Sequence, residues 1–244
     1  MESATGVQFP PTRWSLIRQA GKTVDPSTRQ QALEEICRSY WRPLYAFARR
    51  KGCPPPDAED LTQSFLATLL HKDTLTSADS RAGSLRTFLL ARFQTFLVDA
   101  WRHDHAQKRG GGASHLPLDF QDAEQWCARE MQDTASPDAA FERQWVNALL
   151  ELVLQRVRGE YETGGRVTQF EVLRPFLNFD DTASDYAGAA ATLEISVAAV
   201  RQAVHRLRER FARALREHIA ATLADPAPEA VDEELAALRA ALTV

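Results

Sequence analysis

Apolar residues recur at helical spacing along nearly the whole chain, and no run of strict apolar–polar alternation is long enough for a strand. The segment 31–50 is typical, because its apolar side chains fall on one face. They are Leu33, Ile36, Cys37, Tyr40, Leu44 and Phe47. A helix buries a stripe with a period of about 3.6 residues, whereas a half-buried strand needs a period of about 2. The pattern therefore predicts an all-α fold.

Proline and glycine divide this pattern into separate helices. Pro43 should kink or restart the first helix, and Gly52 with the proline run 54–56 should end it. Asp57 is a good N-cap for a second helix, because its carboxylate can accept a hydrogen bond from a free backbone N–H. We expect this second helix to end near His71.

A third helix is expected from Leu85 to about Asp104, and its two sides differ in chemistry. A broad apolar arc contains Leu85, Leu89, Phe93, Phe96, Leu97, Ala100 and Trp101. A narrow opposite stripe contains Phe88, Arg92, Thr95, Asp99 and Arg102. An aromatic ring beside two arginines could stack on bases while the cations hold phosphates. The simpler alternative places Phe88 in the core and leaves the arginines as a solvated face.

Charge is distributed unevenly, although the net charge is only −4. Residues 31–109 and 184–224 carry more Lys and Arg than Asp and Glu, whereas 110–140 and 225–244 carry more acidic residues. We therefore predict two mildly basic helical domains joined by a flexible acidic linker. The predicted divisions are an N-terminal arm at 1–30, a first domain at 31–109, a linker at 110–135, a second domain at 136–224 and an acidic C-terminal extension at 225–244.

Several classes of protein are disfavoured by what the sequence lacks. No stretch has the roughly 18 uncharged apolar residues of a membrane span, and the opening residues lack a signal peptide, so we expect a cytoplasmic protein. Cys37, Cys53 and Cys127 form no CxxC pair, which argues against a disulfide frame or a zinc site. No GxSxG, HExxH or P-loop motif occurs, so neither an enzyme nor a cofactor is expected.

The segment from Tyr186 to Phe211 has the form of a helix-turn-helix. Leu193 and Ile195 should bury the turn, and Ser196 should cap a longer second helix. The inner stripe of that helix is Val200, Val204, Leu207 and Phe211. Its outward row is Ala198, Ala199, Arg201, Gln202, His205, Arg206 and Arg208. Such a helix can enter the major groove of DNA. A purely structural helical hairpin remains the alternative for this segment.

Glu194 lies where a turn of this kind commonly has glycine. A residue with a Cβ costs up to about 1–2 kcal/mol there if the backbone is left-handed.

Together these segments resemble bacterial RNA polymerase sigma factors of the extracytoplasmic-function type. In that family two helical domains, region 2 and region 4, are joined by a variable linker. Residues 57–70 are similar to a region 2 helix, and Phe88-Leu89, Asp99 and Arg102 fit the pattern of the helix that follows it. Residues 186–208 are similar to the region 4 helix-turn-helix. The opening FPPTRWSLIRQA and the ending VDEELAALRAAL resemble one branch of the family.

The resemblance implies three sets of binding residues. For docking on the clamp helices of the polymerase large subunit they are Asp57, Asp60, Leu61, Gln63 and Phe65. For the −10 element, where a loop captures a flipped base, they are Ser80, Arg81, Ser84, Arg86, Phe88, Arg92, Thr95, Asp99 and Arg102. For the −35 element they are Ser196, Ala198, Ala199, Arg201, Gln202, His205 and Arg206.

The resemblance thus implies a sigma factor that directs core RNA polymerase to promoter DNA and helps to open it, with no cofactor, metal ion or membrane contact. The alternative is a sigma-like helix-turn-helix regulator or adaptor that binds DNA but does not initiate transcription. The sequence leaves open whether an anti-sigma factor binds the chain. It also leaves open whether the segment 231–242 is a regulatory helix or a packing arm.

Overall fold

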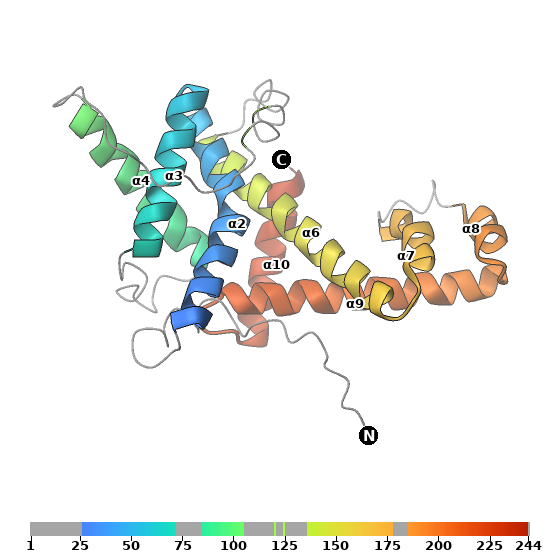
Figure 1. Cartoon of the computed structure of the whole chain (residues 1–244). Helices are drawn as coiled ribbons and strands as arrows, with labels where there is room; N and C mark the ends of the chain where they lie inside the picture. Colours follow the sequence, from blue (N-terminus) through green and yellow to red (C-terminus); the bar gives the residue numbers. More distant parts are fainter. Residues whose placement is uncertain are drawn as a thin grey trace. The chain divides into compact units, whose positions relative to one another are not determined.

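The computed structural model describes residues 26–71, 84–104, 120, 124, 136–177 and 185–243 (Figure 1). Within these ranges 88% of the residues are helical and none lies in a β-strand, so the prediction of an all-α fold is confirmed. Ser84 and Leu223 form an isolated antiparallel β-bridge. None of the described helices combines the length and the hydropathy that a membrane crossing requires.

The chain divides into two compact units. Unit 1 comprises residues 1–148 and 219–244, and unit 2 comprises 149–218. Both boundaries fall inside long helices, the first in α6 (Pro137–Thr163) and the second in α9 (Val197–Thr222). These units differ from the divisions that we expected from the sequence, so the assignment of function to 31–109 and 136–224 stays a prediction.

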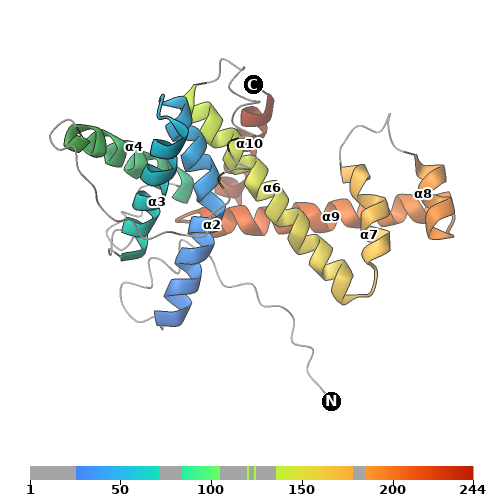
Figure 2. The same ribbon diagram turned by 45° about the horizontal axis from the view of Figure 1, so that its top comes forward.

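Three helices form the centre of unit 1: α2 (Pro26–Arg50), α3 (Pro55–His71) and α4 (Leu85–Asp104). Figures 1 and 2 show them next to one another, and α2 packs against both of the others. Phe93 of α4 is fully buried, with its ring centroid 5.0 Å from that of Phe65 and 6.2 Å from that of Phe47. Burial of these rings stabilises the three-helix core.

Two details of helices α2 and α3 differ from the expectation. Helix α2 continues through the buried Pro43, so the predicted restart is wrong. Burial of the surrounding face outweighs the hydrogen bond that proline cannot donate. Helix α3 begins at Pro55, which places Asp57 in the first turn and not at the N-cap. Proline suits this first position because its φ is already helical and its missing N–H would have no intrahelical partner. The predicted end at His71 is confirmed.

Two described residues from the expected linker contact helix α2. The ring of Phe120 lies edge-on to Trp41 and Tyr45, with centroids 5.1 and 5.3 Å away. Glu124 accepts hydrogen bonds from Arg49 Nε at 2.9 Å and Nη2 at 2.8 Å. The bidentate hydrogen bond from Arg49 holds the pKa of Glu124 below its ordinary value, assisted by a hydrogen bond from Tyr45 and opposed by partial burial.

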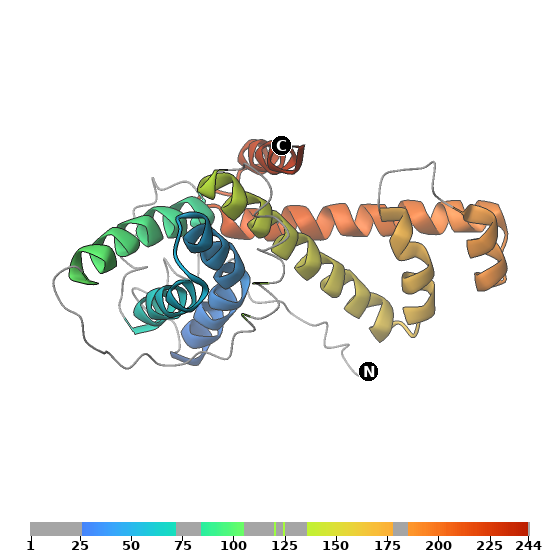
Figure 3. The same cartoon turned by 90° about the horizontal axis from the view of Figure 1, so that it is seen from above.

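Unit 1 also contains the first part of α6 and helix α10 (Pro228–Thr243). Ser136 caps α6, because its Oγ accepts a hydrogen bond from the Ala139 N–H at 3.2 Å. In α10 the side chains of Val231 and Leu238 are buried. Figure 3 shows α10 beside the beginning of α6, so the acidic extension forms a packed helix of unit 1.

Unit 2 contains the remainder of α6, α7 (Val167–Leu173), the 3-10 helix η3 (Arg174–Leu177), α8 (Tyr186–Leu193) and most of α9. Helix α6 ends just before a glycine pair, and Gly165 has a positive φ of 66°. Phe170 packs on Tyr161, and Phe176 packs on Tyr186, with ring centroids 5.7 and 4.7 Å apart. The polar segment 180–184, where the sequence favours a turn, lies outside the described residues.

The pairing of Glu124 with Arg49 predicts a defined pH dependence of stability. The pKa of Glu124 is lower in the folded state than in the unfolded chain. The pair therefore contributes its full stabilisation above about pH 4.5, and this contribution is lost as the pH falls through the folded-state pKa. We expect Glu124→Gln to lower the free energy of unfolding by up to about 1 kcal/mol at pH 7. This difference from the wild type should shrink as the pH falls towards about 3.

Urea denaturation between these pH values measures the effect. The control is Glu162→Gln, which changes an exposed glutamate in the last turn of α6. A difference for Glu124→Gln that does not change with pH would contradict the pairing.

Candidate nucleic-acid interface

Helices α8 and α9 are joined by a tight turn at Glu194. This residue has φ 53° and ψ 38°, which is the left-handed conformation that makes a non-glycine residue costly. The N–H groups of Glu194 and Ile195 bond back to carbonyls in the last turn of α8, including that of Ala190. These hydrogen bonds satisfy the end of α8 and fix the direction in which α9 leaves.

The beginning of α8 is fixed by a side-chain cap. Asp185 Oδ1 accepts a hydrogen bond from the Gly188 N–H at 2.8 Å. A Cβ at Gly188 would lie 2.1 Å from Asp185 Oδ2, so a larger residue there would require the Asp185 side chain to shift. Sequence reasoning missed both residues, although an Asp three positions before a glycine is compatible with such a cap.

The inner stripe of α9 is confirmed for Val200, Val204 and Leu207, which are all buried, and Phe211 is half-buried. The predicted N-cap at Ser196 is also confirmed, since its Oγ accepts a hydrogen bond from the Ala199 N–H at 3.2 Å. Ile195 was expected to bury the turn, but its side chain is 37% exposed. It lies in the turn between the two helices, and the expectation that it buries the turn is therefore wrong.

The outward row of α9 faces solvent. Ser196, Ala198, Arg201, Gln202, His205 and Arg206 are exposed, and Ala199 is half-buried. The Arg201 guanidinium lies 5.6 Å from the ring centroid of Tyr186, which holds it beside α8. The Nε2 atom of His205 lies 3.4 Å from Oε1 of Glu209, one turn later on the same helix.

Arg208 does not belong to this outward row, contrary to expectation. It is half-buried and donates from Nε and Nη2 to the backbone carbonyl of Phe176, at 3.1 and 3.0 Å. The guanidinium thus satisfies a carbonyl of η3 and joins it to α9, because a planar donor fork can make two hydrogen bonds to one acceptor.

The second expected DNA surface follows α4, where Arg92, Thr95, Asp99 and Arg102 are exposed. Phe88 is only 9% exposed and Arg92 lies over its ring, which confirms the alternative that Phe88 belongs to the core. Trp101 was expected in the apolar arc but is 64% exposed. The aromatic cluster of unit 1 is centred on Phe93, about two turns earlier, and the described helices do not cover the end of α4.

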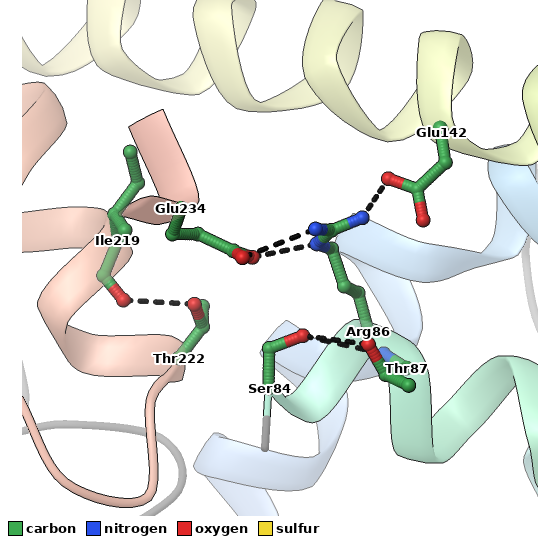
Figure 4. Close-up of polar contacts among 7 residues, drawn as sticks. All are labelled: Ser84, Arg86, Thr87, Glu142, Ile219, Thr222 and Glu234. Carbon is green, nitrogen blue, oxygen red and sulfur yellow. Dashed lines mark hydrogen bonds and ion pairs between the residues drawn. The ribbon is translucent and has the colours of Figure 1, made fainter. Parts of the chain in front are cut away.

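Arg86, the second residue of α4, is buried in a polar cluster (Figure 4). Its Nε and Nη2 donate to the two carboxylate oxygens of Glu234 in α10, at 2.6 and 3.1 Å, and its Nη1 donates to Glu142 in α6. Its guanidinium lies 5.4 Å from the ring centroid of Trp145. Arg86 was expected among the DNA-contacting residues, but two carboxylates occupy all three of its nitrogen atoms. The pairing of Arg86 with Glu142 and Glu234 could not be predicted from the sequence, because these residues lie far apart along the chain.

Ser84, which precedes α4, is also buried, and its hydroxyl lies 3.0 Å from that of Thr87. The other two expected residues of this loop, Ser80 and Arg81, lie outside the described residues.

On α3 the structure separates the expected docking residues into two groups. Asp57 and Asp60 are exposed and Leu61 is half-buried, whereas Gln63 and Phe65 are buried. The expectation that Gln63 faces outward is therefore wrong, because its side chain is buried. Only the two aspartates and part of Leu61 remain accessible on this row.

In the parts of the chain that the structure describes, no group of His, Cys, Asp and Glu residues could hold a metal ion. No family model, curated protein or solved structure matches the chain. A functional assignment therefore depends on the residues and geometry given above.

The strained turn predicts a gain in stability. We expect Glu194→Gly to raise the free energy of unfolding by about 0.5–1 kcal/mol, because the relief of about 1–2 kcal/mol in the left-handed region exceeds the cost of a more flexible unfolded chain. The matched control is Gln155→Gly inside α6, which should lower the free energy of unfolding by about 1 kcal/mol. Thermal and urea denaturation measure both changes. Destabilisation by Glu194→Gly would contradict the left-handed assignment.

Proposed function

We propose that the chain is a sigma subunit of the extracytoplasmic-function type, which directs core RNA polymerase to promoters in the cytoplasm and assists DNA opening. The observation that carries the proposal is the helix-turn-helix of unit 2, whose outward row is exposed while its inner stripe is buried. In this mode of binding the second helix lies in the major groove.

The chemistry of this row suits duplex DNA. Arg201 and Arg206 could donate to guanine edges or phosphates, and Gln202 could pair with adenine. Ala198 and Ala199, at the beginning of α9, would allow the helix to approach the bases closely. His205 adds a further hydrogen-bonding group one turn after Arg201.

Unit 1 supports the proposal through a different surface. On α4, Thr95, Asp99 and Arg102 are exposed together with the indole of Trp101. Single-stranded nucleic acids favour aromatic rings, on which bases stack, together with cations, which pair with phosphates. Trp101 comes from the apolar arc of α4 and not from the stripe of Asp99 and Arg102, but its indole is exposed. It therefore replaces the buried Phe88 as the stacking residue in this proposal for the −10 element.

The exposed aspartates of α3 would contact the polymerase. Asp57 lies in the first turn of the helix and Asp60 follows one turn later, both accessible to a partner. Two carboxylates at this position could steer association with the basic surface of a partner and fix its register.

Burial of Gln63 and Phe65 favours a second function, because it leaves the proposed docking row with few accessible side chains. A DNA-binding regulator or adaptor that does not engage the polymerase would need no docking row on α3. Copurification with core polymerase separates the two functions, since only the sigma subunit should form a stable complex.

The proposal is tested by run-off transcription with core polymerase on a promoter library. We expect specific transcripts only when the chain is added. Charge reversal by Asp57→Lys with Asp60→Lys should weaken binding to core polymerase roughly tenfold at low salt, and less at high salt where the charges are screened.

The matched control reverses two other exposed acids, Glu162→Lys with Asp225→Lys. Thermal unfolding verifies that both double variants fold. Equal binding of the two double variants to polymerase would remove the docking assignment, and absence of any transcript with the wild type would reject the proposed function.

Arg201 should determine part of the −35 preference. We expect Arg201→Ala to reduce discrimination against one altered base pair by about 1–3 kcal/mol, because a bidentate contact with a base edge is lost. Arg213→Ala, at an exposed position on the same helix, should weaken binding to all sequences about equally. Binding of the holoenzyme to a panel of −35 variants measures both effects. The same loss on every sequence for Arg201→Ala would contradict base recognition.

A further inference from the structure

We propose that helix α10 covers a DNA-backbone contact at Arg86, and that α10 must leave before the guanidinium can bind a phosphate. The inference rests on the proposed function, because it requires promoter DNA to reach α4. It identifies the acidic extension as an intramolecular competitor of DNA.

The geometry of Glu234 is that of a phosphate substitute. Its two carboxylate oxygens accept from Arg86 Nε at 2.6 Å and from Nη2 at 3.1 Å (Figure 4). A phosphate group would use the same donor fork with two of its oxygens. The Arg86 and Glu234 side chains are only 11% and 12% exposed, so a phosphate cannot reach these donors while α10 is in place.

The cluster can lose Glu234 without leaving a buried charge unpaired. Glu142 of α6 accepts a hydrogen bond from Nη1 of Arg86. This contact does not involve α10, so it would remain when α10 leaves. With both glutamates present, one guanidinium faces two carboxylates, which leaves an excess negative charge in a half-closed site. Departure of α10 would remove one of these carboxylates, and a phosphate of equal negative charge could then take the place of Glu234.

The attachment of α10 is also small. In its described side chains only Val231 and Leu238 are buried apolar groups, whereas Glu229, Asp232 and Glu233 are exposed. A helix with so few buried apolar side chains belongs to the part of a structure that opens locally.

The charge of the extension fits this role. Residues 225–244 carry Asp225, Glu229, Asp232, Glu233 and Glu234 against a single cation, Arg239. Such a segment presents the same sign of charge as a nucleic-acid backbone, so α10 and DNA would exclude each other at Arg86. The apparent affinity of the free chain for DNA is then reduced by the fraction of molecules in which α10 has left.

The test compares two neighbouring glutamates of α10 in the full chain. Glu234→Gln removes the charge that faces Arg86, and Glu233→Gln removes an equal charge from an exposed position on the same helix. Fluorescence anisotropy with a fluorescein-labelled 20-nucleotide single strand of mixed sequence reports binding, because a phosphate contact does not depend on sequence.

We expect Glu234→Gln to bind the strand roughly three- to tenfold more tightly than Glu233→Gln. The slope of log affinity against log salt should become steeper by about 0.7, as one more phosphate is contacted. Adding Arg86→Gln to Glu234→Gln should abolish the gain, with circular dichroism confirming that the helices persist. Equal affinity of the two single variants, or a gain that survives Arg86→Gln, would overturn the inference.

A second measurement does not use a substitution in the cluster. Hydrogen exchange of the wild-type chain should show faster exchange in α10 when the single strand is added, because DNA binding selects molecules in which α10 has left. Unchanged or slower exchange at saturating strand would overturn the inference. If the wild type supports run-off transcription while these tests fail, only the role of α10 is wrong; if no transcript forms with core polymerase, the proposed function itself fails.

Discussion

A buried guanidinium must be paired, and in unit 1 this requirement applies to Arg86. Its carboxylate partners lie 56 and 148 positions further along the chain, in α6 and α10. Leaving a buried charge without any partner is far more costly than removing an exposed ion pair. The positions of α4, α6 and α10 around Arg86 therefore depend on this one side chain. A cation–π contact with the indole of Trp145 stabilises its guanidinium further.

Local features of the fold could be read from the sequence. The bounds of α4, the end of α3, the cap at Ser196 and the inner stripe of α9 were predicted, because spacing and capping act over a few residues. The left-handed backbone at Glu194 was foreseen as a condition of the turn. The beginning of α3 was misplaced because a proline run can either end one helix or begin the next.

Long-range contacts could not be predicted. Arg86 and Gln63 have the polarity of surface residues, and only the packing of distant helices buries them. Trp101 was the opposite case, because apolar character and spacing predicted burial at a helix end that no described helix covers. Likewise, nothing local indicated that Phe120 and Glu124 of the acidic segment would attach to α2. The candidate sites were thus predictable as faces of helices but not as sets of accessible groups.

The two proposed DNA surfaces have different chemistry, each understandable within its own unit. The row on α9 combines cations and an amide with small side chains on a rigid helix, which suits the edges of paired bases. The end of α4 combines an indole with a hydroxyl, a carboxylate and arginines, which suits bases that have left the duplex. Neither surface is evident from a net charge of −4, because the acidic residues are concentrated elsewhere.

The turn between α8 and α9 shows how two helices can be joined through a left-handed residue that is not glycine. Its shape is held by the main-chain bonds that Glu194 and Ile195 make to the end of α8, so the side chain at the bend is free to vary at a modest energetic cost. Sequence patterns that demand glycine at this position would therefore overlook motifs of this geometry, whereas patterns built on the capping residues and the inner apolar stripe would retain them.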